Sequence, residues 1–140
     1  MKGIVIASHG RLAEGMLDTL KIFAGEQEQL ETLCLMPGDD IDGFIEKIRG
    51  AVDRVDTGEG VVVFCDLLFG SPCNCSARLF GDAEYQKKME VITGMNLSMV
   101  LEFAGSRGSS EYDGDALIQT GRNGIVDLKK LMNERKSRGE

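Results

Sequence analysis

His9 is the only histidine in the 140-residue chain, and it stands directly after a short aliphatic run. The stretch IVIASHG at 4–10 passes from β-branched residues into Ser8, His9 and Gly10. An apolar run of this kind is typical of a buried strand, which places His9 just past the end of that strand. An imidazole there can serve as a nucleophile, although a lone histidine is more often an ordinary polar loop residue.

Asp66 is the carboxylate that could work with this histidine. It stands in GVVVFCDLLF at 60–69, the most hydrophobic run, which predicts a central strand. A carboxylate that accepts a hydrogen bond from the imidazole Nδ1–H leaves Nε2 free to attack. No serine or cysteine stands with a suitable partner, so we interpret His9 itself as the attacking group. Taken alone, Asp66 could equally well have only a structural role, as a turn residue or a helix cap.

The stretch LLFGSPCN at 67–74 follows Asp66 and predicts the start of a helix, with Ser71 as N-cap and Pro72 at the first helical position. Free backbone N–H groups near Gly70 and Ser71, with the Ser71 hydroxyl, would form an anion site. A histidine nucleophile facing such a site suggests phosphoryl transfer. Neither a P-loop nor a GxGxxG motif is present, so a phosphorylated protein is a better donor than a nucleotide.

Strand and helix patterns alternate along the chain, which predicts an α/β fold with parallel βαβ units. We expect an open, mainly parallel sheet of about four strands in the flavodoxin-like order 2-1-3-4, with helices on both faces. In this order the first and third strands are neighbours, so His9 and Asp66 meet at the switch point where ligands bind. The expected strands lie at 3–7, 30–36, within 60–69 and within 89–96.

The expected helices follow these strands. The first would carry its core stripe on Leu12, Met16, Leu20 and Phe23. The second would begin at Asp39 or Asp40 and bury Ile41, Phe44, Ile45, Ile48, Val52 and Val55. Later helices are expected over 97–104 and from 116, on either side of a polar loop at 105–115. The segment GIVDL at 124–128 could form a short edge strand or continue the last helix.

Length and charge restrict the function. A chain of 140 residues is most simply one domain, 1–140, with a charged tail at about 129–140. The net charge of −7 makes nucleic acid and anionic membrane surfaces poor partners. The four cysteines are interpreted as small buried apolar residues of a protein in a reducing compartment. Their spacing does not match that of a metal site. With no signal peptide or membrane-spanning run expected, the cytoplasm is the predicted location.

The sequence resembles the enzyme IIA domain of the mannose-class (mannose/fructose/sorbose) sugar phosphotransferase system. Four segments carry the resemblance, in order and over nearly the whole chain: IVIASHGRLAEGM at 4–16, DLLFGSPCN at 66–74, EVITGMNLSMVLE at 90–102 and TGRNGI at 120–125. The resemblance implies that His9 is phosphorylated on Nε2, that Asp66 orients it, and that Ser71 stands at the phosphoryl-binding helix start.

The resemblance also implies the partners. The donor would be the histidine-containing phosphocarrier protein and the acceptor an enzyme IIB domain, which passes the group to sugar entering through membrane permease subunits. Members of the family form homodimers that exchange a C-terminal strand, for which GIVDL at 124–128 is the candidate. No metal or organic cofactor is expected.

One departure from the family pattern falls in the active-site loop. Leu68 stands where the family has an aromatic residue, and Phe69 stands where it has a glycine. If that position needs a positive φ, Phe69 is strained there, which would affect loop shape and the fit of partners.

Other functions fit the same residues. The chain could be a phosphotransfer subunit for a dihydroxyacetone kinase, or a regulatory module that binds partners according to its phosphorylation. It could also be a flavodoxin-like binder of a small phosphorylated ligand. Phosphorylation of Asp66 as in a receiver domain is disfavoured, because no acidic pair ends the first strand to hold magnesium.

Overall fold

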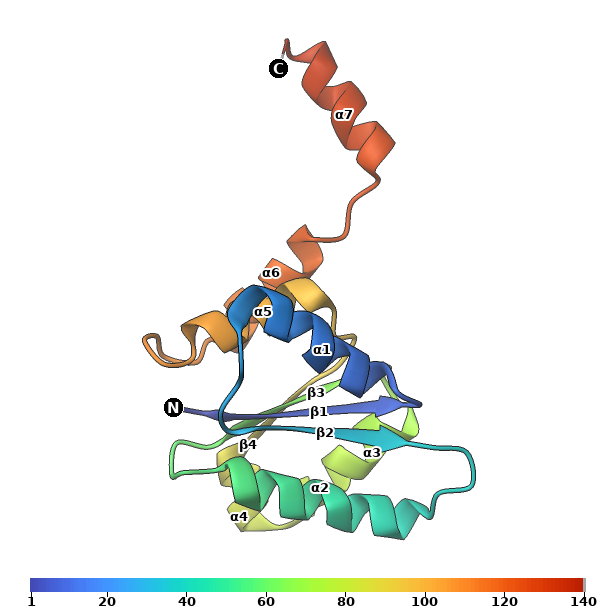
Figure 1. Cartoon of the computed structure of the whole chain (residues 1–140), viewed down its shortest axis with the longest axis vertical. Coiled ribbons are helices and arrows are strands. Elements are labelled where there is room, and N and C mark those ends of the chain that lie inside the picture. Colours follow the sequence, from blue (N-terminus) through green and yellow to red (C-terminus); the bar gives the residue numbers. More distant parts are fainter. Residues whose placement is uncertain (140) are drawn as a thin grey trace.

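A four-stranded parallel sheet forms the centre of the computed structural model, which describes residues 1–139 (Figure 1). Its strands are β1 (Gly3–His9), β2 (Leu30–Leu35), β3 (Val61–Cys65) and β4 (Met89–Ile92). They lie in the order β2-β1-β3-β4, and all three neighbouring pairs are parallel. The predicted order 2-1-3-4 is therefore confirmed.

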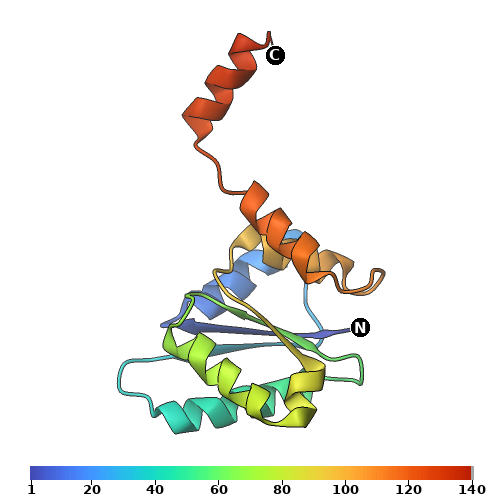
Figure 2. The same cartoon turned by 180° about the vertical axis from the view of Figure 1, so that it is seen from behind.

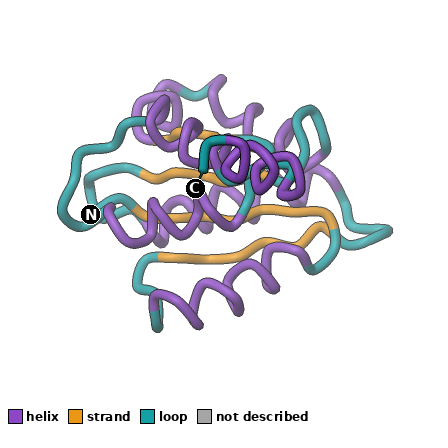
Figure 3. The backbone as a smooth tube through the Cα atoms, turned by 90° about the horizontal axis from the view of Figure 1, so that it is seen from above, coloured by secondary structure: helices purple, strands orange, loops and turns teal. Residues whose placement is uncertain are grey.

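Helices cover both faces of this sheet, as predicted (Figures 1 and 2). One layer contains α1 (Leu12–Ala24), α5 (Leu97–Ser106) and α6 (Gly114–Asn123). The other contains α2 (Ile41–Val55), α3 (Ser71–Arg78), a 3-10 turn (Leu79–Gly81) and α4 (Ala83–Lys88). The 3-10 turn and α4 were not predicted. Figure 3, seen from above, shows the strands side by side, with helices running along them.

Burial of both sheet faces explains why the central strands are apolar without alternation. In β1, Ile4 and Ile6 pack towards α1 and α5, whereas Val5 and Ala7 pack towards α2 and α3. Residues of β3 divide in the same way, and the strand is fully buried. The two central strands are thus fixed from both sides, and their carboxyl ends are held in register.

Two local expectations are corrected by the structure. β1 runs two residues further than predicted, because Ser8 and His9 still pair with Cys34 and Leu35 of β2. In α1, the two inner residues of the predicted stripe, Met16 and Leu20, do pack on the sheet, but its two ends, Leu12 and Phe23, are exposed. Ala13 and Leu17 complete the face that meets the sheet, at helical spacing from Met16 and Leu20.

The C-terminal region also differs from expectation. The segment at 124–127 forms neither a strand nor a continuation of α6. The expected charged tail is a helix, α7 (Leu128–Ser137), which begins where the Asp127 side chain accepts from the Lys130 N–H. It stands away from the rest of the molecule in Figure 1, and none of its residues is buried. Among residues 1–139, no helix combines the length and apolar character needed to cross a membrane.

Arg107, at the end of α5, ties the amino ends of β1 and β2 together. Its guanidinium donates to the carbonyl oxygens of Lys2, Glu28 and Gln29 and to the side chain of Gln27. The residue is 7% exposed. Because Lys2 and the segment at 27–29 are far apart in sequence, the side chain of Arg107 links the starts of two neighbouring strands.

We predict that Arg107→Met destabilises the fold. The substitution keeps much of the buried stem but removes the four hydrogen bonds of the guanidinium, at a cost of about 2 kcal/mol or more. Urea unfolding monitored by circular dichroism measures the change. Arg54→Met, which removes an exposed ion pair with Glu31, is the matched control and should shift the midpoint much less. Equal shifts for the two variants would contradict the structural role of Arg107.

Candidate functional site

The candidate site lies at the carboxyl edge of the sheet, between its two central strands. His9 is the last residue of β1, and Asp66 follows the last residue of β3. The pairing of Ala7 with Cys65 brings these two ends together. The His9 Nδ1 and the Asp66 Oδ2 are 2.9 Å apart. The two residues that the sequence placed at one switch point are thus in direct contact.

Asp66 holds both the backbone and the ring of His9. Its Oδ2 accepts from the His9 backbone N–H at 2.9 Å as well as from the ring, and its Oδ1 accepts from the Leu67 N–H at 2.9 Å. The carboxylate is 12% exposed, whereas the imidazole is 45% exposed. The geometry commits Nδ1 to the carboxylate and leaves Nε2 as the nitrogen available for chemistry.

The charge of Asp66 is stabilised by these contacts. Burial by itself would raise the pKa of the carboxyl group, but the hydrogen bonds from the backbone and ring of His9 oppose it. The pKa of Asp66 therefore lies below its ordinary value of 3.8. An ionised carboxylate at this position can stabilise positive charge on the imidazole.

Gly70 lies against the imidazole ring of His9. A Cβ atom at Gly70 would come 2.6 Å from His9 Cε1 and 3.3 Å from Nε2. Any residue can adopt the Gly70 φ of −71°. Glycine is required here because a side chain would collide with the imidazole ring, and not because of the backbone conformation. The contact places Nε2 beside the start of α3.

The start of α3 differs by one residue from the prediction. Gly70 is the N-cap, Ser71 is the first helical residue and Pro72 follows it, because the first helical bond runs from the Asn74 N–H to the Gly70 carbonyl at 2.9 Å. Within residues 1–139, neither the N–H nor the hydroxyl of Ser71 has a hydrogen-bond partner. The free groups of Ser71 next to Nε2 can therefore bind an anion.

The loop between Asp66 and α3 has a strained backbone at Phe69. The φ of Phe69 is +63°, in the left-handed region that bulky residues rarely adopt. The Asn74 Nδ2 donates to the Phe69 carbonyl at 2.9 Å and holds this conformation. The sequence indicated no role for Asn74 beyond its place in the loop motif. A contact from a helix back to the preceding loop leaves no periodic pattern in the sequence.

Ser8 and the cysteines are explained by structure. The Ser8 hydroxyl is buried, accepts from the Ala13 N–H at 2.8 Å and donates to the Gly10 carbonyl, so it organises the first turn of α1. All four cysteines are free. Burial raises the pKa of Cys65, next to Asp66, to about 12, so this thiol stays protonated at neutral pH and is a poor nucleophile.

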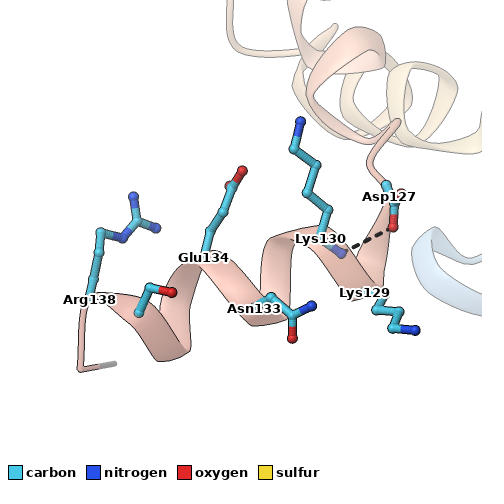
Figure 4. A pocket seen from close by; sticks show the side chains of 7 residues that line it. Asp127, Lys129, Lys130, Asn133, Glu134 and Arg138 are labelled. Atoms are coloured by element: carbon cyan, nitrogen blue, oxygen red, sulfur yellow. Dashed lines mark hydrogen bonds between the residues drawn. The ribbon is translucent and has the colours of Figure 1, made fainter.

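A pocket at some remove from these residues lies along α7 (Figure 4). Its lining comes from this helix and its two flanking residues, including Asp127, Lys130 and Glu134. The labelled lysine, carboxylate, amide and guanidinium side chains all belong to α7 and its flanking residues, and they project from it in different directions. The pocket contains neither His9 nor Asp66, and we do not assign the chemistry to it.

The site thus combines an imidazole held by a carboxylate with a free helix N-terminus on an open parallel sheet. This set of groups is suited to phosphoryl transfer, because an imidazole nitrogen can attack phosphorus and free N–H groups at a helix start can hold its oxygens.

Comparison with known proteins identifies the family. Residues 3–119 match the EIIA-man family, described as the fructose IIA component of the phosphotransferase system (PTS). The chain belongs to this family, whose members are phosphotransferases that accept and pass on phosphoryl groups.

Individual relatives agree with this assignment. The mannose-specific EIIAB component of the PTS of Escherichia coli is 34% identical over 129 residues, which cover 90% of this chain and 39% of that protein. The chain therefore spans about two-fifths of that relative. The sorbose-specific EIIA component of Klebsiella pneumoniae is 31% identical, over 78% of this chain and 77% of its own. The crystal structure of EIIA from Streptococcus agalactiae superposes with a TM-score of 0.82 at 31% identity, covering 93% and 99% of the two chains.

We predict that Gly70→Ala displaces the His9 ring without unfolding the chain. The new methyl group cannot sit 2.6 Å from Cε1, and the ring is the part that can move. Phosphorylation of the protein should slow, and the imidazole signals in NMR spectra should shift. Gly105→Ala is the matched control, since its Cβ would meet nothing within 4 Å. Unchanged ring signals in Gly70→Ala would contradict the contact.

We predict that the stabilising effect of Asp66 disappears in acid. Because the folded pKa lies below the ordinary 3.8, Asp66 stabilises the fold fully above that value, and the effect is lost as the pH falls through the folded pKa. Asp66→Asn should be less stable than the wild type at pH 7, and the two should converge on acidification below 3.8. Unfolding in urea over a pH series measures this. A difference that is the same at every pH would argue against an ionised, hydrogen-bonded carboxylate.

Proposed function

We propose that this chain is a phosphoryl carrier of a phosphoenolpyruvate-dependent sugar phosphotransferase system and that His9 is the residue that carries the group. The observation that supports this most is the hydrogen bond between the His9 Nδ1 and Asp66, which leaves Nε2 beside the start of α3. The donor is the histidine-containing phosphocarrier protein, and the acceptor is an enzyme IIB domain.

The transfer needs no net movement of a proton. The Nε2 lone pair of neutral His9 forms a bond to phosphorus as the P–N bond of the donor phosphohistidine breaks. The donor ring, which keeps its own N–H, leaves as neutral imidazole, and the His9 ring becomes positively charged. Asp66 accepts from Nδ1–H throughout and stabilises that charge. The P–N bond is conserved in kind, so the step is reversible.

The start of α3 supplies the binding groups for the phosphoryl oxygens in this proposal. The Ser71 hydroxyl and N–H are free to donate, and Gly70 allows the ring to approach them. These donors act most strongly on the charge of the transferring group and are arranged before the partner arrives. The roles of Gly70 and Ser71 are therefore binding and positioning, while His9 is the nucleophile.

The wider assembly follows from the same proposal. We propose a single IIA unit over 1–140 that works in the cytoplasm, where its four free thiols are compatible with a reducing environment. Membrane permease subunits take part only indirectly, through the IIB acceptor. A homodimer would form if the segment at 124–128 pairs with a second copy; Ile125, Val126 and Leu128 there are exposed.

We predict that His9→Ala abolishes labelling by phosphoenolpyruvate in the presence of the general phosphotransferase proteins. Wild-type chain should gain one phosphoryl group that is labile to acid and stable to base. Asp66→Asn should be labelled more slowly, on the order of 10²-fold, because the charge on the ring loses its counter-ion. Mass spectrometry of intact protein over time measures both.

Asp113→Asn is the matched control for the carboxylate substitution. Asp113 caps α6, a role that asparagine fills equally well, so labelling should match the wild type. A fully labelled His9→Ala would end the proposal. Labelled wild type that charges no IIB domain would instead favour a regulatory module.

A further inference from the structure

Asn74 makes two hydrogen bonds to the loop that leads from Asp66 to α3. Its backbone N–H donates to the Gly70 carbonyl at 2.9 Å, as the first bond of the helix. Its side-chain Nδ2 donates to the carbonyl of Phe69, the residue before Gly70, also at 2.9 Å. Asn74 is exposed, so its side chain is not needed to fill the core. One surface residue thus holds two consecutive carbonyl groups.

These two carbonyl groups belong to the peptides on either side of Gly70. In a trans peptide the carbonyl and the following N–H point in opposite directions, and residues 1–139 contain no cis peptide. The bond from the Asn74 side chain therefore turns the Gly70 N–H away from Asn74, and this N–H donates to the Leu67 carbonyl at 3.0 Å. The bond from the Asn74 backbone likewise leaves the Ser71 N–H pointing out of the helix start. Gly70 is thus fixed on both sides.

The orientation of Gly70 matters because the imidazole ring of His9 lies against it. A Cβ atom at Gly70 would come 2.6 Å from Cε1 and 3.3 Å from Nε2 of that ring. The N–H and hydroxyl of Ser71, which have no partner among residues 1–139, belong to the next residue. The two peptides that flank Gly70 therefore set where these donors lie relative to Nε2.

The loop needs such a restraint because its backbone is strained. The φ of Phe69 is +63°, which is sterically unfavourable for a residue with a Cβ atom. Strained conformations persist only where the surrounding contacts determine them. Two hydrogen bonds hold the peptide between Phe69 and Gly70, one from the Asn74 side chain and one to the Leu67 carbonyl. Loss of the first leaves a single restraint, and relaxation of Phe69 would then move Gly70.

We infer that Asn74 is a positioning residue for phosphoryl transfer. By holding the Phe69 carbonyl it keeps Gly70 against the His9 ring and the free groups of Ser71 next to it. The inference rests on the proposed function and adds a residue to it. Donors that are arranged before the reaction stabilise the transferring charge without reorganisation. A loop that has lost this restraint should therefore slow the transfer step itself.

The test measures transfer kinetics in a double-mutant cycle. Phosphorylation of wild type, Asn74→Ala, Phe69→Gly and the double variant is followed over a range of concentrations of the phosphorylated phosphocarrier protein. Asn74→Ala should lower kcat about 10-fold and leave KM for the donor unchanged. In the Phe69→Gly background, where glycine adopts the positive φ without strain, the same substitution should lower kcat no more than about 2-fold. Phosphoramidate, a small donor that releases ammonia, should give the same two ratios.

Two further variants separate this role from a general effect on the fold. Asn74→Asp has the same shape but no N–H to donate, so it should be slowed at least as much as Asn74→Ala. Gln119→Ala is the matched control, because it also removes an exposed side-chain hydrogen bond, of 2.8 Å to Asn123 within α6. It should be phosphorylated at the wild-type rate. Circular dichroism should show the same folded signal for all of these proteins.

Several results would overturn the inference. One is an unchanged kcat in Asn74→Ala or in Asn74→Asp, and another is a loss of rate that accompanies a loss of folded signal. An equal loss with and without Phe69→Gly would also overturn it, since Asn74 would then not act through Phe69. A loss confined to KM for the protein donor would assign Asn74 to the donor surface instead. Wild type that the phosphocarrier protein does not label would refute the proposed function itself.

Discussion

The hydrogen bonds between Asp66 and His9 are the constraint on which the site depends. One carboxylate oxygen accepts from both the backbone N–H and the ring Nδ1 of the same residue, each at 2.9 Å. The ring is thereby oriented relative to the strand that carries it. This arrangement exists only because β1 and β3 are neighbours and end at the same edge. The residues that pack on both faces of the sheet hold these two strands in place. They therefore also fix the position of His9 relative to Asp66.

The polar residues around this pair divide into those that the fold uses and those that it leaves free. Ser8 is adjacent to His9 in sequence, but its hydroxyl is occupied by the first turn of α1. Cys65 is adjacent to Asp66, but burial keeps its thiol protonated. Ser71 and the imidazole Nε2 have no hydrogen-bond partner among residues 1–139, and Gly70, which precedes Ser71, lies against the imidazole ring. The site is thus a small set of uncommitted groups on a rigid edge.

Much of this could be predicted from the sequence. Buried strands and amphipathic helices have clear periodicity, and the alternation of the two gives the sheet order and brings His9 to Asp66. The features that were wrong or missed depend on individual contacts that leave no repeating pattern in the sequence. The ends of the buried α1 face were wrong, since Leu12 and Phe23 are exposed while the small Ala13 is buried. Gly70 is the N-cap in place of Ser71, because its carbonyl accepts the first helical hydrogen bond. The Asn74 contact depends on a loop shape that no pattern describes.

The central claim is that the phosphoryl group is carried on Nε2 of His9, the nitrogen that Asp66 leaves free. The most direct measurement is NMR of protein labelled with ¹⁵N in histidine after phosphorylation by the donor, which shows the ring nitrogen coupled to phosphorus. The account predicts coupling at Nε2, with the proton retained on Nδ1. Coupling at Nδ1, or a phosphorylated protein whose single histidine shows no coupling, would contradict it.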